Sequence, residues 1–364
     1  MRMKRTLTWS VALLTFVLLA GCATGPVKAK QRYFWPPPPD VPRVEWLGFY
    51  QNKTQLKQEG FMSEVLGDDN VISLGFPVFA AGDGMGRMYV SDHKLFGVMV
   101  FDFNTLTTHL LGSPKGNVNT TGILRPSGIA FDADGLLYVG DTEGKKVFVF
   151  DKNEKAIRVL DFTKTCKSIA FFSIDKLRKH LIIPDVQGHK IVITDLSGKV
   201  INSFGVRGGR DGDFNYPSAT AVDSSGNILV CDQMNARVEV FTPDGVFKSK
   251  FGKRGDGVGE FSIIKGVAVD SEGHVYVSDG RGNKVTIFSE AGDLLLQVGY
   301  PFAEQSATSA TPGGFNFPNG IFIDQNDTIY VADVLNLRVQ VFQYLNEKYL
   351  KEHPVSNAAA PRLK

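Results

Sequence analysis

One motif, a short apolar run that ends in an aspartate, recurs six times along this chain of 364 residues. The intervals between successive aspartates are 49, 44, 47, 47 and 54 residues. A period in this range is typical of repeat architectures, in which each unit buries its apolar face against the next unit. The repeat therefore predicts one array of similar units rather than two separate domains. The aspartates are Asp92, Asp141, Asp185, Asp232, Asp279 and Asp333.

Each copy has the pattern of four antiparallel strands. In the fourth copy an apolar run at 219–222 precedes the aspartate, and the turn residues Ser225 and Gly226 separate it from the run that the aspartate closes. A strictly alternating run follows at 237–241, and a fourth run lies at 246–251. Tight turns between such runs are typical of β-hairpins. Each unit is therefore predicted to be a four-stranded antiparallel meander, with strands a, b, c and d in chain order.

Two further positions keep the phase of the repeat. A proline stands 15 residues before the aspartate in four copies, and a phenylalanine stands nine residues after it in five copies. The third copy departs from both, with Cys166 in place of the proline and Thr194 in place of the phenylalanine. Its first hairpin is also three residues longer than the others. We therefore expect the third unit to be the least regular.

These segments and their phase resemble the NHL repeat. The resemblance implies an all-β fold, a six-bladed β-propeller of four-stranded antiparallel blades over residues 76–350. The last copy lacks a clear fourth strand, whereas a strand-like run lies before the first copy, at 44–50. Because an unpaired edge invites aggregation, we expect residues 43–75 to supply a strand that closes the last blade and a short helical lead-in at 54–66. Residues 351–364 are expected to form a flexible tail.

The N-terminus has the features of an export signal. Residues 1–5 are basic, and residues 7–19 form an apolar stretch of 13 residues, too short to span a hydrocarbon core of about 30 Å. The following tetrapeptide, LAGC at 19–22, resembles a bacterial lipobox. That resemblance implies that residues 1–21 are a signal peptide and that acylated Cys22 anchors the chain to a membrane.

The residues after Cys22 bear on where the anchored chain lies. In lipoproteins of this kind an aspartate after the cysteine favours retention at the inner membrane, and Ala23 stands here instead. The resemblance therefore implies an outer-membrane address in the bacterial cell envelope, with the side of that membrane left open. Residues 22–42 include four consecutive prolines at 36–39 and are predicted to form an extended, proline-rich tether.

The charge of the chain argues against a polyanionic partner. The sequence has 40 Lys and Arg residues against 38 Asp and Glu residues, a formal charge of +2. Three of the basic residues and none of the acids lie in residues 1–21, so removal of that segment leaves a charge of −1. A nearly neutral chain lacks the strong positive field that nucleic-acid binding requires, and we predict no nucleic-acid partner.

One face of the predicted propeller carries the candidate binding residues. In each blade the start of strand a, the b–c turn and the connector from strand d to the next blade lie on the same face. Basic side chains gather there over the third to fifth blades. We expect them to bind an envelope protein or a small anionic ligand, with a solvated charged rim as the alternative. The residues are Arg207, Arg210, Lys253, Arg254 and Arg281, beside Lys167, Lys265 and Asn319 at the mouth of the axial channel.

The six repeated aspartates are predicted to be structural. Aspartate side chains commonly accept hydrogen bonds from backbone N–H groups of the turn that follows them. Five of the six also have a basic residue five positions later, with which each should pair: Lys146, Lys190, Arg237, Lys284 and Arg338.

Some six-bladed propellers that the chain resembles are metal-dependent enzymes. The lactonases hold calcium through Glu, Asp and Asn oxygens, and the predicted channel mouth has no carboxylate. The amidoglycolate lyases hold zinc through converging histidines, whereas His93 and His189 are predicted in turns of non-neighbouring blades. We predict no catalytic residue, metal or cofactor, and interpret the chain as a lipid-anchored, monomeric binding scaffold. The alternative is a metal-dependent lyase or hydrolase with its active site over the central channel.

Cys166 and Cys231 are predicted on one face of adjacent blades, as buried thiols or as a disulfide.

Overall fold

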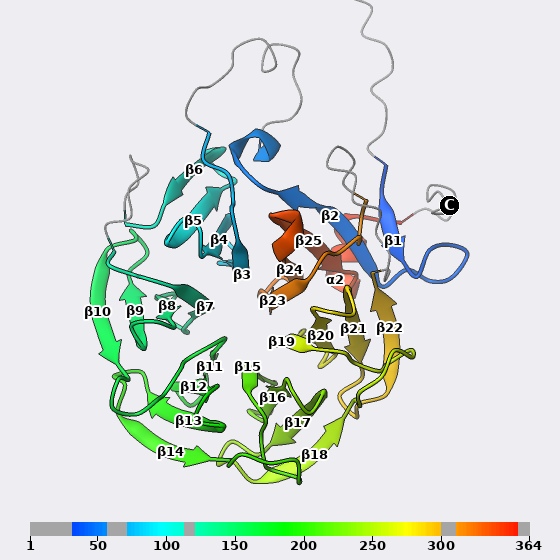
Figure 1. Ribbon diagram of the computed structural model, residues 1–364. Coiled ribbons are helices and arrows are strands. Elements are labelled where there is room, and N and C mark those ends of the chain that lie inside the picture. The colour runs from blue at the N-terminus through cyan, green and yellow to red at the C-terminus, as the bar shows by residue number, and fades with distance from the viewer. Residues whose placement is uncertain (1–30, 57–70, 113–120, 300–310, 356–364) are drawn as a thin grey trace, which may run out of the picture. The chain divides into compact units, whose positions relative to one another are not determined.

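The computed structural model of the chain describes residues 31–56, 71–112, 121–299 and 311–355. The chain divides into two units, residues 1–32 and 33–364, and all the elements below belong to the second. In that unit six antiparallel sheets follow one another around a ring (Figure 1). The predicted all-β, six-bladed propeller is therefore confirmed.

Blades 1 to 5 each contain four consecutive strands, and the first strand of each blade lies nearest the axis (Figure 1). These inner strands contact one another around the ring. The bounds are β3 (Pro77–Gly82), β4 (Arg87–Asp92), β5 (Gly97–Asp102) and β6 (Thr107–Leu110) in blade 1; β7 (Pro126–Phe131), β8 (Leu137–Asp141), β9 (Lys146–Phe150) and β10 (Ala156–Asp161) in blade 2; β11 (Ser173–Asp175), β12 (His180–Asp185), β13 (Lys190–Asp195) and β14 (Val200–Phe204) in blade 3; β15 (Pro217–Val222), β16 (Ile228–Asp232), β17 (Arg237–Phe241) and β18 (Phe247–Phe251) in blade 4; and β19 (Ile264–Val269), β20 (Val275–Asp279), β21 (Lys284–Phe288) and β22 (Leu294–Val298) in blade 5.

Blade 6 combines strands from both ends of the chain. β23 (Pro318–Ile323), β24 (Thr328–Asp333) and β25 (Arg338–Tyr344) form its inner part. β2 (Val44–Tyr50) pairs antiparallel with β25 and completes the sheet. The predicted closure of the last blade by an N-terminal strand is therefore confirmed.

A fifth strand of blade 6, β1 (Tyr33–Trp35), pairs with the outer side of β2. It lies within residues 22–42, for which the sequence predicts only a tether. Trp35 is 4% exposed and its ring centroid lies 5.7 Å from that of Phe342, so burial of this indole accounts for the added strand. The prolines at 36–39 lie in the connection between β1 and β2, because residues without an N–H cannot continue the ladder.

The repeated phenylalanine packs between neighbouring blades. Phe241 on β17 lies with its ring centroid 4.8 Å from that of Phe204 on β14 and 5.5 Å from that of Phe214 in the connector between blades 3 and 4. All five phenylalanines at this position are at most 3% exposed. Each such burial contributes roughly 1.5–3 kcal/mol. The phenylalanine position, nine residues after the aspartate, therefore lies in the core between neighbouring blades.

Blade 3 is the least regular, as predicted. Its inner strand β11 has three residues, whereas the inner strands of the other blades have six. Just before it, Phe171 forms a parallel bridge with Ala219 on β15 of the next blade. The Phe171 ring then lies 5.0 Å from that of Phe79 on blade 1.

The inner strands of all six blades surround an axial cavity of only about 160 Å³.

The lead-in helix and the tail are described only in part. A 3-10 helix, η1 (Lys53–Leu56), occupies the start of the lead-in predicted at 54–66, and the rest of that segment lies outside the described residues. The short helix α2 (Glu347–Glu352) extends into the predicted tail, of which residues 356–364 lie outside the described residues.

The predicted signal peptide and Cys22 also lie outside the described residues. Among the residues that the structure describes, none of the helices has the length and apolar character needed to cross a membrane.

Deletion of residues 43–51 is expected to lower the melting temperature by roughly 10 °C or more, because it removes the β2–β25 ladder and exposes the edge of blade 6. A milder variant is Val44→Asp, since Val44 is 1% exposed, and its control is Val41→Asp, at a position 69% exposed. Differential scanning calorimetry measures each shift. An unchanged melting temperature in the deletion variant would rule out the closing role of β2.

Candidate functional site

The b–c turns and the connectors between blades form one face of the ring, called the connector face below. The repeated aspartates lie beneath it. Asp92 accepts hydrogen bonds from the backbone N–H groups of Gly75 (2.7 Å) and Phe76 (2.9 Å) before blade 1, and of Lys94 (2.8 Å) in its own turn. The other five likewise accept from the connector that precedes their blade. Each carboxylate therefore links the connector before its blade to the b–c turn. The sequence predicts only the hydrogen bonds within the turn.

The aspartates form ion pairs at the two arginine positions. Arg237 Nε lies 3.0 Å from Asp232 Oδ2, and Arg338 Nε lies 2.7 Å from Asp333 Oδ2. Lys284 instead donates to a connector carbonyl. Within the described residues none of the three lysines at this position pairs with its aspartate within 4 Å. The expected pairing therefore occurs only where a guanidinium group can reach the aspartate and the connector at once.

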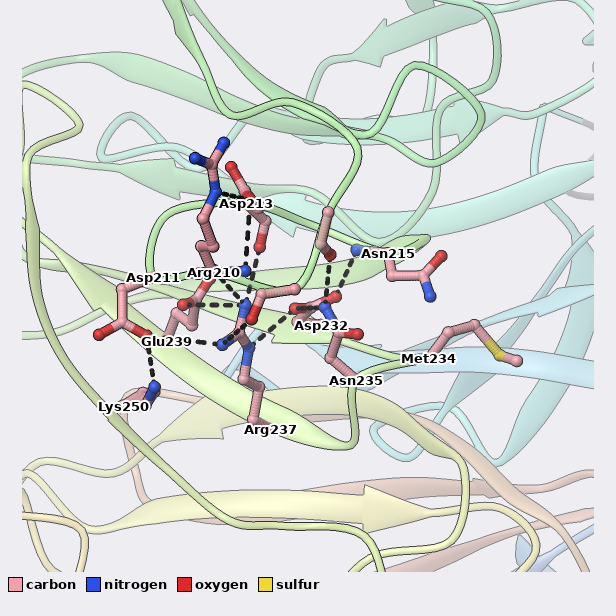
Figure 2. Close-up of polar contacts among 12 residues, drawn as sticks. Arg210, Asp211, Asp213, Asn215, Asp232, Met234, Asn235, Arg237, Glu239 and Lys250 are labelled. Carbon is pink, nitrogen blue, oxygen red and sulfur yellow. Dashed lines mark hydrogen bonds and ion pairs between the residues drawn. The ribbon is translucent and has the colours of Figure 1, made fainter.

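A buried glutamate completes the network around Arg237 (Figure 2). Glu239 on β17 is 0% exposed; its Oε1 lies 3.2 Å from Arg237 Nη2 and accepts a hydrogen bond from the N–H of Gly212. Its Oε2 has no hydrogen-bond partner in the described residues. Burial raises the pKa of Glu239 to about 7. The corresponding residue in blade 6 is a neutral amide, Gln340.

The connectors are held in one conformation by close packing. Gly205 (φ +92°) and Gly252 (φ +83°) open the connectors that lead into blades 4 and 5. A Cβ atom at these glycines would lie 2.4 Å and 2.5 Å from ring carbons of Phe214 and Phe261. Both phenylalanines are fully buried. The connectors are therefore fixed loops that position the side chains they carry.

Four of the five cations predicted for binding project from these connectors and Arg281 from the b–c turn of blade 5, and three of the four on the connectors are engaged by neighbouring groups. The Arg210 side chain is 88% exposed and pairs with Asp213 at 3.1 Å, and Lys253 is 76% exposed and pairs with Glu260 at 2.9 Å. Arg254 donates to two backbone carbonyls. Arg207 and Arg281 are exposed, and no ion pair within 4 Å involves them among the described residues. The face therefore has less free positive charge than the sequence indicates.

The residues predicted at the channel mouth do not join this group. Lys167 is exposed and Asn319 is half-buried. The Lys265 ammonium lies 5.6 Å from the centroid of the Phe317 ring, and burial lowers the pKa of Lys265. Within the described residues, no contact joins these three side chains to the arginines of the connectors.

The cysteines and histidines have separate surroundings. Cys166 and Cys231 are free, buried thiols, and burial raises the pKa of each to about 12. His93 Nε2 lies 3.0 Å from the carbonyl oxygen of Pro126, and His189 packs against Tyr216. Among the described residues no group of three or more His, Cys, Asp or Glu side chains is arranged to hold a metal ion.

The opposite face, formed by the a–b and c–d hairpins, has a cavity of about 560 Å³ lined by blades 1, 2 and 6 and by Lys176 of blade 3. Arg87 lines it and lies 3.4 Å from Asp102 and 3.6 Å from Glu154 of blade 2, which also contacts His109 at 2.7 Å. Sequence reasoning missed this hollow, because it depends on hairpins of the first and last blades that meet only when the ring closes.

The network in Figure 2 predicts a change in the pH dependence of stability. The pKa of Glu239 is about 7 in the folded chain against an ordinary value of 4.5, so its favourable, protonated state is lost as the pH rises through 7. Glu239→Gln removes this titration. Its free energy of unfolding is expected to exceed that of the wild type by an amount that grows from pH 5 to about pH 7, to on the order of a few kcal/mol, and is constant above that; the melting temperature should follow the same trend.

The converse change, Gln340→Glu, is expected to destabilise blade 6 increasingly over the same pH range, because it places a second carboxylate beside Asp333. Calorimetry at four pH values between 5 and 8 measures both variants. Parallel pH profiles for the wild type and Glu239→Gln would contradict the assignment.

Comparison with known sequences supports the fold. Residues 219–307 match a family described as a 6-bladed beta-propeller, and residues 124–150 and 315–342 match the NHL repeat. The E3 ubiquitin-protein ligase TRIM71 of Rattus norvegicus is 30% identical over 176 residues, which are 46% of this chain and 18% of that protein. The chain thus spans less than a fifth of the length of this relative.

Solved structures share the architecture at low identity. A protein of unknown function from Bacteroides thetaiotaomicron aligns with a TM-score of 0.60 at 18% identity over 76% of this chain and 71% of that chain. An auxiliary nutrient binding protein from the same organism gives 0.57 at 12% over 75% and 70%, and virginiamycin B lyase from Staphylococcus aureus gives 0.53 at 12% over 74% and 95%. At these identities the similarity extends to the fold alone. The chain is therefore a six-bladed β-propeller, with the NHL repeat matched in its second and sixth blades.

Proposed function

We propose that the chain is a lipid-anchored binding scaffold of the bacterial envelope, which recognises an acidic protein partner through the connector face of blades 4 and 5. The observation that carries the proposal is the fixed conformation of the two connectors that hold the exposed cations. Loops that are already ordered lose little conformational entropy on binding. Charges held in fixed positions also favour a partner of complementary charge.

Arg207 and Arg281 are the strongest candidates for contact with the partner. Both are exposed, on the first of the two connectors and on the b–c turn of blade 5. Arg210 and Lys253 already have acidic partners, which a bound protein would have to displace. Surface pairs of this kind contribute about 0–1 kcal/mol, so their exchange costs little.

The membrane anchor of the proposal is the acylated Cys22. Strand β1 begins at Tyr33, so the span between the anchor and the folded ring is shorter than the tether predicted over residues 22–42. Eleven residues reach at most roughly 40 Å when fully extended. An anchored ring would therefore stay close to the outer membrane, where an envelope partner can meet it.

Reversal of the two free charges, Arg207→Glu with Arg281→Glu, is expected to abolish crosslinking of an acidic envelope protein to the full-length chain in native membranes. The matched control is Lys155→Glu with Lys199→Glu, which changes the charge equally at two exposed positions of the opposite face. Quantitative mass spectrometry of the crosslinked material measures recovery. Equal recovery from wild type and the connector-face variant would eliminate this binding surface.

Cys22→Ser is expected to abolish incorporation of a labelled fatty acid and to release the protein from the membrane fraction. Cys166→Ser is the control, because the Cys166 thiol is buried within the fold. Gradient separation of inner and outer membranes then tests the address. Label retained in Cys22→Ser would refute the anchor, and a band in the inner membrane would refute the outer-membrane address.

A further inference from the structure

In blade 4 an arginine fills the space between strand c, the b–c turn and the connector. Besides its ion pair with Asp232, Arg237 donates to three connector carbonyls (Figure 2). These are the oxygens of Gly209 (3.2 Å), Arg210 (2.8 Å) and Asp213 (2.9 Å). The connector and the turn therefore form a shell of acceptors around a planar guanidinium group.

Blade 6 repeats this arrangement. Arg338 pairs with Asp333 and donates to the carbonyl oxygen of Gly314 at 2.6 Å. The side chain two positions after the arginine closes the space, as Glu239 in blade 4 and Gln340 in blade 6. Two of the six blades thus hold an internal guanidinium group at the same place.

Blade 5 has the same shell with smaller side chains inside it. Lys284 stands in place of the arginine, and Thr286 in place of the glutamate or glutamine. Its connector matches that of blade 4, since Arg254 bridges to Phe261 as Arg207 does to Phe214. Lys284 Nζ donates to one carbonyl, that of Glu260, at 2.8 Å. A cavity of about 210 Å³ remains, lined among others by Asp256, Gly257, Asp279, Arg281, Lys284 and Gln297.

One buried polar group that lines this cavity, Gln297, has an acceptor atom without a donor. Gln297 Oε1 and the hydroxyl of its cross-strand neighbour Thr286 are buried with no hydrogen-bond partner among the described residues. Asp279 is 0% exposed and accepts hydrogen bonds from backbone N–H groups. No cation lies within 4 Å of its carboxylate in the described part of the chain, unlike Asp232 and Asp333. Such groups lower stability until a donor satisfies them.

We propose that this cavity, the blade 5 slot, binds the guanidinium group of a ligand. The guest would take the place that Arg237 and Arg338 occupy in their own blades, between the connector carbonyls and the anchor aspartate. Its five N–H donors match a site composed of carbonyl, carboxamide and carboxylate oxygens. The inference does not depend on the acidic partner or on the membrane anchor.

Lys284 makes the slot selective. Its ammonium group and the guanidinium group of Arg281 both line the cavity and repel any cation, and the carboxylates of Asp256 and Asp279 offset this repulsion. A guanidinium group spreads its charge over a plane and is weakly hydrated, whereas an ammonium group is compact and strongly hydrated. The slot should therefore accept arginine-like ligands and exclude lysine-like ones.

Titration calorimetry of the full-length protein with methylguanidinium and with the capped peptide Gly-Arg-Gly tests the proposal, with capped Gly-Lys-Gly as the control. Saturable binding of a guanidinium probe is expected. The variant Lys284→Arg fills the slot from within and should weaken that binding by about tenfold or more while raising the melting temperature. The matched variant is Lys146→Arg in blade 2, where Phe148 occupies the position of Thr286, and it should leave the binding of the guanidinium probe unchanged.

A second variant, Gln297→Leu, removes an acceptor at the slot and should weaken binding several-fold without loss of stability. Tighter binding of the peptide than of methylguanidinium would identify a protein arginine as the guest, and the reverse would identify a small guanidine. Absence of saturable binding to the wild type, equal binding by Lys284→Arg, or equal binding of the lysine peptide would each overturn the proposal.

Discussion

The buried aspartate at the end of each strand b is the interaction on which the ring depends. All six of these carboxylates are at most 1% exposed, and each is compensated by N–H groups of the connector that precedes its blade. A carboxylate removed from water without such donors costs several kcal/mol. The connector and the turn must therefore keep the conformation that supplies the donors. One aspartate per blade thus fixes both the connector that leads into the blade and the turn between strands b and c.

The fold could be predicted from the sequence because each blade repeats the same residues at nearly the same spacing along the chain. The phase of the aspartates and phenylalanines determines six blades, and the missing fourth strand of the last copy indicates the closing role of β2. Strand β1 could not be predicted, because three residues before a proline run show no alternation. The connector donors to each aspartate also escaped prediction, unlike those of its own turn, since they lie 16 to 18 residues away in the chain. The cavity between the first and last blades requires a closed ring.

The candidate site depends on where the copies differ. The aspartate is constant, whereas the residue five positions later is glycine, lysine or arginine, and the residue seven positions later ranges from valine to glutamate. Lysine and arginine look equivalent in a sequence pattern, yet only the guanidinium group of Arg237 and Arg338 spans the turn and the connector. Differences between blades thus give a symmetric ring its individual pockets and the buried Glu239, whose pKa is raised.

The closure of blade 6 also sets the order of events during synthesis. β2 is among the first strands to be made, and its partner β25 is among the last: Trp46 lies opposite Phe342. At roughly 5–20 residues per second, translation of the intervening chain takes on the order of 15 to 60 seconds. For that time the edge of β2 that faces β25 in the folded ring is uncovered, and only the short strand β1 can pair with its other edge. The ring can therefore close only after β25 has been made, and until then β2 is open to chaperones and to misassembly with other nascent chains.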